Sequence, residues 1–270
     1  MRQLVKIELR RAFFGRPMCI ALLIGLAIAV SHVVMHVLPL GEHIYDSSMA
    51  GYPLTVFQHW MGGENVSLQP VLYYLVVPLL CSMPYLSTFY SDKNSGYVRN
   101  VFIRADRNNY FTAKYVVTFL SAGFIAVIPL LANFLLSAMI LPAALPQAGT
   151  GLYSIGGLSL IGGLFYVQPY LYLLAYMVIN FVFFGLLVTI GLLVGYFAEN
   201  IFVVILSPFM LYLLIFGVTQ LSGAHAFCPF AFLRPSQPVA TSWGILTFEV
   251  LMLLVAGGVY FAISRKKEVY

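Results

Sequence analysis

The chain has little charge and no polar stretch long enough to fold as a separate soluble domain. Of its 270 residues only 9% are charged, while 61% are hydrophobic. An average soluble domain has roughly 25% charged residues. The mean hydropathy of +0.92 agrees. We therefore predict a single all-α integral membrane domain that covers residues 1–270.

The sequence also lacks the common catalytic motifs. No G-x-x-x-x-G-K-[ST] loop is present to hold nucleotide phosphates. No H-E-x-x-H occurs, and no nucleophile and base, or pair of glutamates, stands in adjacent spans as an intramembrane protease would need. The sequence shows no groove of aromatic and basic residues that would suggest binding of nucleic acid. We therefore predict that the chain is not an enzyme and that it binds no cofactor, metal or nucleic acid of its own.

Cysteine is scarce and odd in number. Of Cys19, Cys81 and Cys228, the first two lie in apolar runs, where a cysteine acts as a small hydrophobic residue. No disulfide framework follows. His32 and His36 stand one turn apart, a spacing that suits two imidazoles on one metal. Without further ligands, we favour a histidine pair that faces a neighbouring helix.

Positive charge is confined to three patches. Thirteen of the fourteen Lys and Arg residues lie within residues 2–16, 93–114 and 265–267. Basic residues that flank membrane spans stay on the cytoplasmic side. All three patches and both termini are thus predicted to be cytoplasmic, with Arg234 as the only cation outside. The same charge suits anionic membrane lipids.

Hydrophobic runs of about 20 residues predict six membrane spans. Residues 1–16 are too charged to cross and too apolar to be a free tail, which predicts an interfacial helix with Leu4, Ile7 and Phe14 on one face. The predicted spans are 17–38, 70–90, 110–140, 169–195, 201–221 and 243–264.

Two connecting segments carry unusual composition. Residues 92–110 are the most polar part of the chain and predict a short cytoplasmic helix with an apolar side. Residues 222–242 contain the apolar run 226–233, which is too short to span and too apolar for water. We expect a re-entrant or surface-lying element there, provided that protein covers its backbone.

Few polar groups lie inside the spans. Glu249 is costly in an apolar span, so it marks either a pathway or a side chain that reaches the interface. Asn133 and Asn180 either hold helices together, which we favour, or lie on a pathway or interface. Gly191 and Gly195 form G-x-x-x-G, which predicts close helix packing within the protomer.

The order of these parts resembles the permease subunits of the ABC-2 family of ATP-binding-cassette transporters, especially the small bacterial ones. The resemblance covers essentially the whole chain. It rests on YVRNVFIRADRNNYFTAKYV (97–116), GGLFYVQPYLYLLAY (162–176) and GLLVGYFAENIFVVILSPFMLYL (191–213). These strings are similar to the family's segment after span two and to its fourth and fifth spans.

The resemblance implies a permease in the bacterial cytoplasmic membrane that pairs with a second permease chain. It docks two copies of a cytosolic ATPase subunit, which binds ATP and Mg. Residues 1–16 and about 92–110 would contact that subunit, with a smaller contact at the turn between spans four and five. The implied contact residues are Gly96, Tyr97, Val98, Arg99, Phe102, Arg104, Glu199 and Asn200.

By analogy with the family, the cargo is expected to be amphipathic or hydrophobic, such as an antimicrobial peptide, a drug or a lipid-like compound, and the direction export. Two alternatives stay open. An ATPase-independent carrier or channel would need paired charges near the midplane, where only Glu249 comes close. A non-transport scaffold would use the basic segment for another partner.

Overall fold

The computed structural model describes residues 2–42, 54–103, 106–148, 153, 155–156 and 159–266. These residues form helices and loops, with no strand among them. Six helical stretches are long and apolar enough to cross a membrane. The predicted all-α fold, with six helical stretches suited to cross a membrane, is therefore confirmed, as expected of a multi-pass membrane protein.

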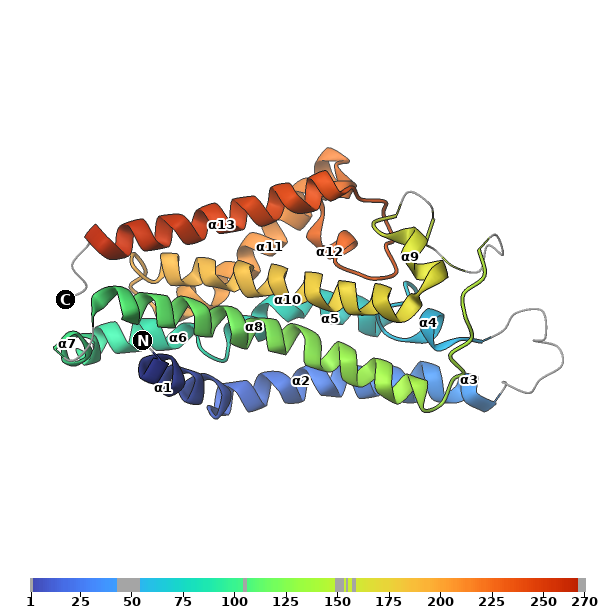
Figure 1. The fold of residues 1–270 in the computed structure, drawn as a ribbon, viewed down its shortest axis with the longest axis horizontal. Helices are drawn as coiled ribbons and strands as arrows, with labels where there is room; N and C mark the ends of the chain where they lie inside the picture. Colours follow the sequence, from blue (N-terminus) through green and yellow to red (C-terminus); the bar gives the residue numbers. More distant parts are fainter. Residues whose placement is uncertain are drawn as a thin grey trace.

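The crossings run side by side along the long axis of the molecule (Figure 1). They are Arg16–Glu42, Leu68–Asn94, Arg107–Ala138, Pro169–Val194, Ile201–Ser222 and Trp243–Arg265. The third to sixth consist of single helices: α8 (Arg107–Ala138), α10 (Pro169–Val194), α11 (Ile201–Ser222) and α13 (Trp243–Lys266). Each boundary lies within a few residues of the predicted one, because the apolar runs set the length.

The first two crossings are interrupted. The first consists of α2 (Arg16–His32), a π-helical turn (Val33–Val37) and α3 (Leu38–Glu42). The second consists of α5 (Leu68–Ser82) and α6 (Leu86–Asn94). Pro84 lies in the gap between α5 and α6, where its missing backbone N–H and its ring disfavour a continuous helix.

Short helices flank the two ends of the bundle. We call the end with α1 (Arg2–Phe13), α7 (Tyr97–Phe102) and the α10–α11 turn the basic end. The opposite end, with α4 (Val56–His59) and α9 (Gly162–Val167), is the loop end. Figure 1 shows α1, α7 and the last turns of α13 at the same end. Between α11 and α13, a 3-10 turn (His225–Phe227) leads into α12 (Pro229–Phe232).

The core lies between α8 and α10 and the helices around them. Glycine allows two of these close approaches. A Cβ on Gly191 would come within 2.3 Å of the Leu86 side chain, and one on Gly195 within 2.9 Å of Phe89. The G-x-x-x-G pair of α10 therefore packs against α6 within the protomer, as predicted.

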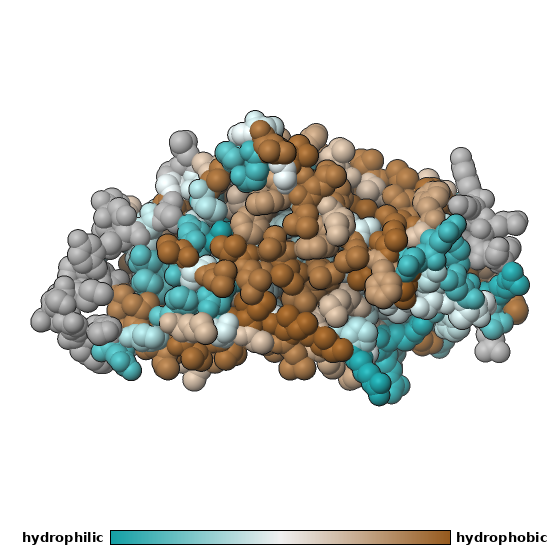
Figure 2. Space-filling model, turned by 180° about the vertical axis from the view of Figure 1, so that it is seen from behind, coloured by the Kyte–Doolittle hydropathy of each residue, from teal (hydrophilic) through white to brown (hydrophobic). Residues whose placement is uncertain are grey.

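The last helices lie at the periphery. In the most apolar stretch of each helix, the buried share is 17% for α11 and 22% for α13. The same share is 61% for α10. Figure 2 shows one face of the molecule, with hydrophobic side chains across its middle and hydrophilic side chains nearer both ends. Such a surface suits contact with lipid chains.

Candidate functional site at the basic end

A buried ion network joins three helices at the basic end. Arg11 of α1 pairs with Asp92 of α6, with Nη2 2.7 Å from Oδ1. Lys114 of α8 pairs with Asp92 at 2.7 Å and with Glu8 of α1 at 3.3 Å. Arg11 also contacts Glu8 at 3.1 Å. Glu8, Arg11, Asp92 and Lys114 are called the ion network below.

Three of these charged groups are almost completely buried. The exposed fraction is 1% for Glu8, 3% for Asp92 and 0% for Lys114. Burying single charges is costly, but two carboxylates and two cations balance one another, and surrounding hydrogen bonds offset the lost hydration. Tyr85 donates to Glu8 at 2.5 Å, and Tyr110 donates to Asp92 at 3.2 Å. The network therefore fixes the positions of α1, α6 and α8 relative to one another.

Arg11 is the most exposed member of the ion network, and the carboxylates beside it stabilise its positive charge. The hydrogen bond to Asp92 raises the pKa of Arg11 above its ordinary value, against the opposing effect of burial, and Glu8 raises it further. Arg11 stays protonated at any physiological pH. Its guanidinium lies 5.2 Å from the ring centroid of Tyr97 in α7, a cation–π distance. Arg11 thus connects α7 to the buried charges.

The first helix packs differently from a helix that only lies on the membrane surface. Its buried residues are Glu8 and Ala12, and partly buried Val5 and Leu9 pack beside Ala12. Ile7 is 55% exposed, so it does not form part of the face that contacts the protein.

The α7 segment presents both anchoring and exposed residues. Gly96 has a φ of 72°, which glycine adopts without strain, and this residue starts α7. Val98 is buried in the core and Phe102 is half-buried against it, so both hold α7 on the bundle. Tyr97 and Arg99 are exposed. Arg104 lies outside the described residues.

The turn between α10 and α11 lies beside α6. Tyr90 donates to the backbone oxygen of Glu199 at 2.5 Å, and Lys93 donates to that of Tyr196 at 3.3 Å. Asn200 caps α11 by accepting from Phe202 N at 3.0 Å. Both predicted contact regions are therefore brought together at the basic end, with Glu199 and Asn200 exposed.

Asn133 and Asn180, which lie within spans, form hydrogen bonds to other parts of the bundle. Asn133 accepts from Met61 N at 2.7 Å and donates to Ala29 O of α2 at 2.9 Å. Asn180 of α10 donates to Leu233 O, in the segment after α12, at 2.9 Å. Glu249 is half-buried in α13 and forms no ion pair among the described residues.

The histidine pair lies toward the loop end. His32 is buried and contacts Glu64 at 2.8 Å, while His36 contacts Gln69 at 3.0 Å. Their ring centroids are 5.5 Å apart. No group of three or more metal-ligating side chains occurs among the described residues.

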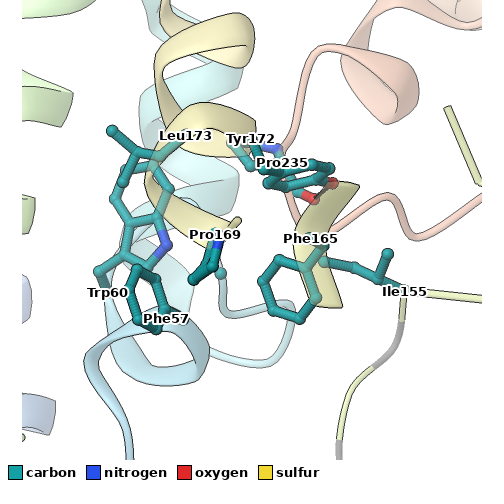
Figure 3. A pocket seen from close by; sticks show the side chains of 9 residues that line it. Phe57, Trp60, Ile155, Phe165, Pro169, Tyr172, Leu173 and Pro235 are labelled. Carbon is teal, nitrogen blue, oxygen red and sulfur yellow. Dashed lines mark hydrogen bonds between the residues drawn. The ribbon is translucent and has the colours of Figure 1, made fainter. Parts of the chain in front are cut away.

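A small apolar pocket also opens at the loop end. Its lining includes Phe57, Trp60, Phe165, Tyr172 and Pro235, which converge in Figure 3. The free space within it is about 10 Å³, which is room for about one water molecule. This pocket alone is therefore too small for a drug-sized ligand.

Sequence reasoning missed the ion network because its members are far apart in the chain. Lys114 was grouped with a cytoplasmic basic patch, yet it is completely buried about two turns inside α8. A signal was present, since a lysine and two carboxylates next to apolar runs need partners. Pairing them required the fold.

No protein-family model matches the chain, and searches of curated proteins and of solved structures find no similar protein.

Proposed function

We propose that this protein is the membrane-spanning permease subunit of a bacterial ATP-binding-cassette transporter, which exports an amphipathic or hydrophobic cargo. A separate cytosolic subunit hydrolyses ATP. The basic end faces the cytoplasm, because basic residues flanking spans are retained there. The chain is an ABC-2-type permease in this proposal, and it works as a dimer of permease chains in the cytoplasmic membrane.

The ion network is the observation that carries the proposal. A soluble motor must transmit its movement to membrane helices through a rigid connection. Arg11 binds α1 to α6 at 2.7 Å, and Lys114 binds α8 to α6 at 2.7 Å and to α1 at 3.3 Å. Force applied to α1 or α7 therefore reaches two crossings without bending a flexible loop.

The surface around α7 supplies the contact for the motor. Tyr97 and Arg99 are exposed, while Val98 anchors the helix from below. The α10–α11 turn with Glu199 and Asn200 is tied to α6 by Tyr90. ATP-driven closure of two motor subunits would push these segments and tilt the attached spans, and hydrolysis would reset them.

The cargo class follows from the apolar surroundings of the spans. Aromatic residues make up 16% of the chain. A path between apolar helices of two permease chains suits a hydrophobic or amphipathic peptide, drug or lipid-like compound. Within this scheme, Glu249 would lie on the path or at the interface of the two chains.

Co-purification with a lone ATP-binding-cassette subunit, encoded beside this chain, tests the proposal. The two proteins should form a complex whose ATP hydrolysis is sensitive to vanadate and needs both. The Arg99→Glu/Arg104→Glu variant should insert into the membrane but lose stimulated hydrolysis. Arg265→Glu, an exposed charge reversal in α13, serves as the matched control.

Failure of the unmodified pair to associate would contradict the proposal and favour an independent carrier or a scaffold. Normal hydrolysis in the Arg99 and Arg104 variant would remove α7 from the motor contact. Association without transport of any amphipathic cargo would leave only a scaffold function.

A further inference from the structure

Arg234 is a buried cation that pairs with no carboxylate in the part of the chain that the structure describes. Its exposed fraction is 4%. Its Nη2 donates to the backbone oxygen of Glu64 at 3.4 Å, while the carboxylate of Glu64 contacts His32 instead. The guanidinium also lies 5.6 Å from the ring centroid of Phe230. These neutral contacts compensate poorly for the lost hydration of a cation.

Several buried polar atoms of this part of the bundle have no hydrogen-bond partner among the described residues. They include Arg234 Nε and the hydroxyls of Tyr74 and Tyr212. Tyr212 is 1% exposed and lies in α11, and its ring centroid is 6.1 Å from that of Phe184 in α10, next to the residue on which Phe232 packs. Buried polar groups in proteins are nearly always hydrogen-bonded. A donor from the guanidinium and a donor from the hydroxyl are thus available in one apolar region.

The segment that carries Arg234 reaches deep between the helices. Leu233 O accepts from Asn180, which lies roughly 16 Å along α10 from its first residue at 1.5 Å per residue. The rings of Phe232 and Phe183 are 5.7 Å apart. The charge therefore lies within the bundle rather than at its solvent-exposed end, and burial lowers the pKa of Arg234 below its ordinary value.

We propose that Arg234 and Tyr212 form a binding site for an oxyanion, a carboxylate or phosphate group carried by a ligand that enters from the loop end. Guanidinium binds both groups through two parallel hydrogen bonds, and a phenol hydroxyl adds a third. A bound oxyanion would satisfy Arg234 Nε and Tyr212 together and neutralise the cation. A single bound group would thus provide a hydrogen-bond acceptor for both donors.

Access to this site runs past Pro235, the next residue, which lines the pocket in Figure 3. Tyr172 donates to the backbone oxygen of Pro235 at 2.5 Å, and Gln237 accepts from Leu160 N at 2.7 Å. Release of these contacts would open a route from the apolar pocket to Arg234. An anionic group on a small apolar body fits that route.

The site is at the other end of the molecule from the motor contact, so its test needs no ATPase. The purified full chain in phosphatidylcholine nanodiscs is titrated with sodium decanoate, with neutral decanol as the comparison, and thermal unfolding is followed. A second arm replaces part of the lipid with phosphatidylglycerol. The first arm reports a soluble carboxylate, and the second a lipid phosphate.

Decanoate, phosphatidylglycerol or both should raise the melting temperature of the unmodified chain, and decanol should not. Arg234→Gln should weaken anion binding about 10-fold or more, because it removes charge-assisted hydrogen bonds. Arg265→Gln removes a cation at the basic end and should have no effect. Tyr212→Phe should weaken binding severalfold. Tyr260→Phe, which removes a buried hydroxyl bonded to Phe111 O, should not.

Arg234→Lys keeps the positive charge if Arg234→Gln fails to fold. Its ammonium cannot form the two parallel bonds, so the anion affinity should again fall. Two results would overturn the proposal. The first is that decanoate and decanol stabilise the chain equally. The second is that Arg234→Lys and Tyr212→Phe bind the anion as tightly as the unmodified chain does. In that case Arg234 serves only to hold the segment after α12 in place.

Discussion

Removing the buried cation of the ion network is the perturbation whose effect follows most directly from the structure. Lys114→Met keeps the length of the unbranched side chain but removes Nζ. That atom lies 2.7 Å from Asp92, 3.3 Å from Glu8 and 3.1 Å from Thr88 Oγ1. The substitution leaves two buried carboxylates with one remaining cation, Arg11.

The expected cost follows from the burial of the partners. Breaking a buried pair by removing one member costs about 3–5 kcal/mol, because the other charge stays buried without its partner. Arg11 continues to contact both carboxylates, so the lower value, about 3 kcal/mol, applies here. Combining Lys114→Met with Asp92→Asn removes one charge of each sign and should recover about 1–3 kcal/mol of the summed loss.

The assay is equilibrium unfolding of the purified chain in mixed micelles by increasing dodecyl sulfate. All four members of the double-mutant cycle are measured together. Lys93→Met is the matched control, since this half-exposed lysine makes one hydrogen bond, to Tyr196 O at 3.3 Å. Its loss should cost about 1 kcal/mol or less.

Two results would refute the reasoning about the network. The first is a Lys114→Met variant that is no less stable than Lys93→Met. The second is a cycle whose single effects add within ~0.5 kcal/mol, as independent sites do. Either result means that Lys114 and Asp92 are not coupled, and that the network does not hold α6 to α8.

The remaining predictions concern other parts of the bundle. Gly191→Val places atoms where a Cβ already lies 2.3 Å from a leucine of α6, so unfolding should become easier by about 1–3 kcal/mol; Gly217→Ala, with no atom within 4 Å of its Cβ, should stay within ~1 kcal/mol of the unmodified chain. Burial raises the pKa of Glu64, but its interactions with His32, Ser67 and His36 together lower it by more, so the pKa lies below its ordinary value. The stability from this carboxylate is then present above the unfolded-state pKa and lost as pH falls through the folded-state pKa. Glu64→Gln should flatten that acid limb of a melting-temperature profile; an unchanged limb would assign it to other groups. Asn133→Leu leaves the Met61 N–H without its acceptor and should cost about 1–3 kcal/mol in the same unfolding assay; a neutral effect would mean that the amide does not hold α8 in place.

The fold could be predicted from the sequence to the extent that long apolar runs determine it. All six crossings were located to within a few residues, since each needs about 20 apolar residues. The interruption near Pro84 was not predicted, although proline is a known helix breaker. Proline alone does not locate such a break, because Pro78, Pro129 and Pro208 lie inside continuous helices of the same bundle.

The arrangement at the basic end could be predicted only in part. Positive charge identified the α7 segment. The sequence did not show that Val98 is buried while its neighbour Arg99 is exposed. Glu8 and Lys114 stand 106 positions apart, and no local pattern indicates such a pair. The orphan donors of Arg234 and Tyr212 likewise become visible only when α11 and the segment after α12 are brought together.

The membrane orientation of the basic end tests the central claim most directly, because a cytosolic motor can act only on that side. Asn100→Cys is introduced into α7 after Cys19, Cys81 and Cys228 are replaced by alanine, and cells are treated with a membrane-impermeant maleimide. The cysteine at position 100 should be protected in intact cells and labelled in inverted membrane vesicles. Labelling in intact cells would place α7 outside and contradict the docking of a cytosolic ATPase there.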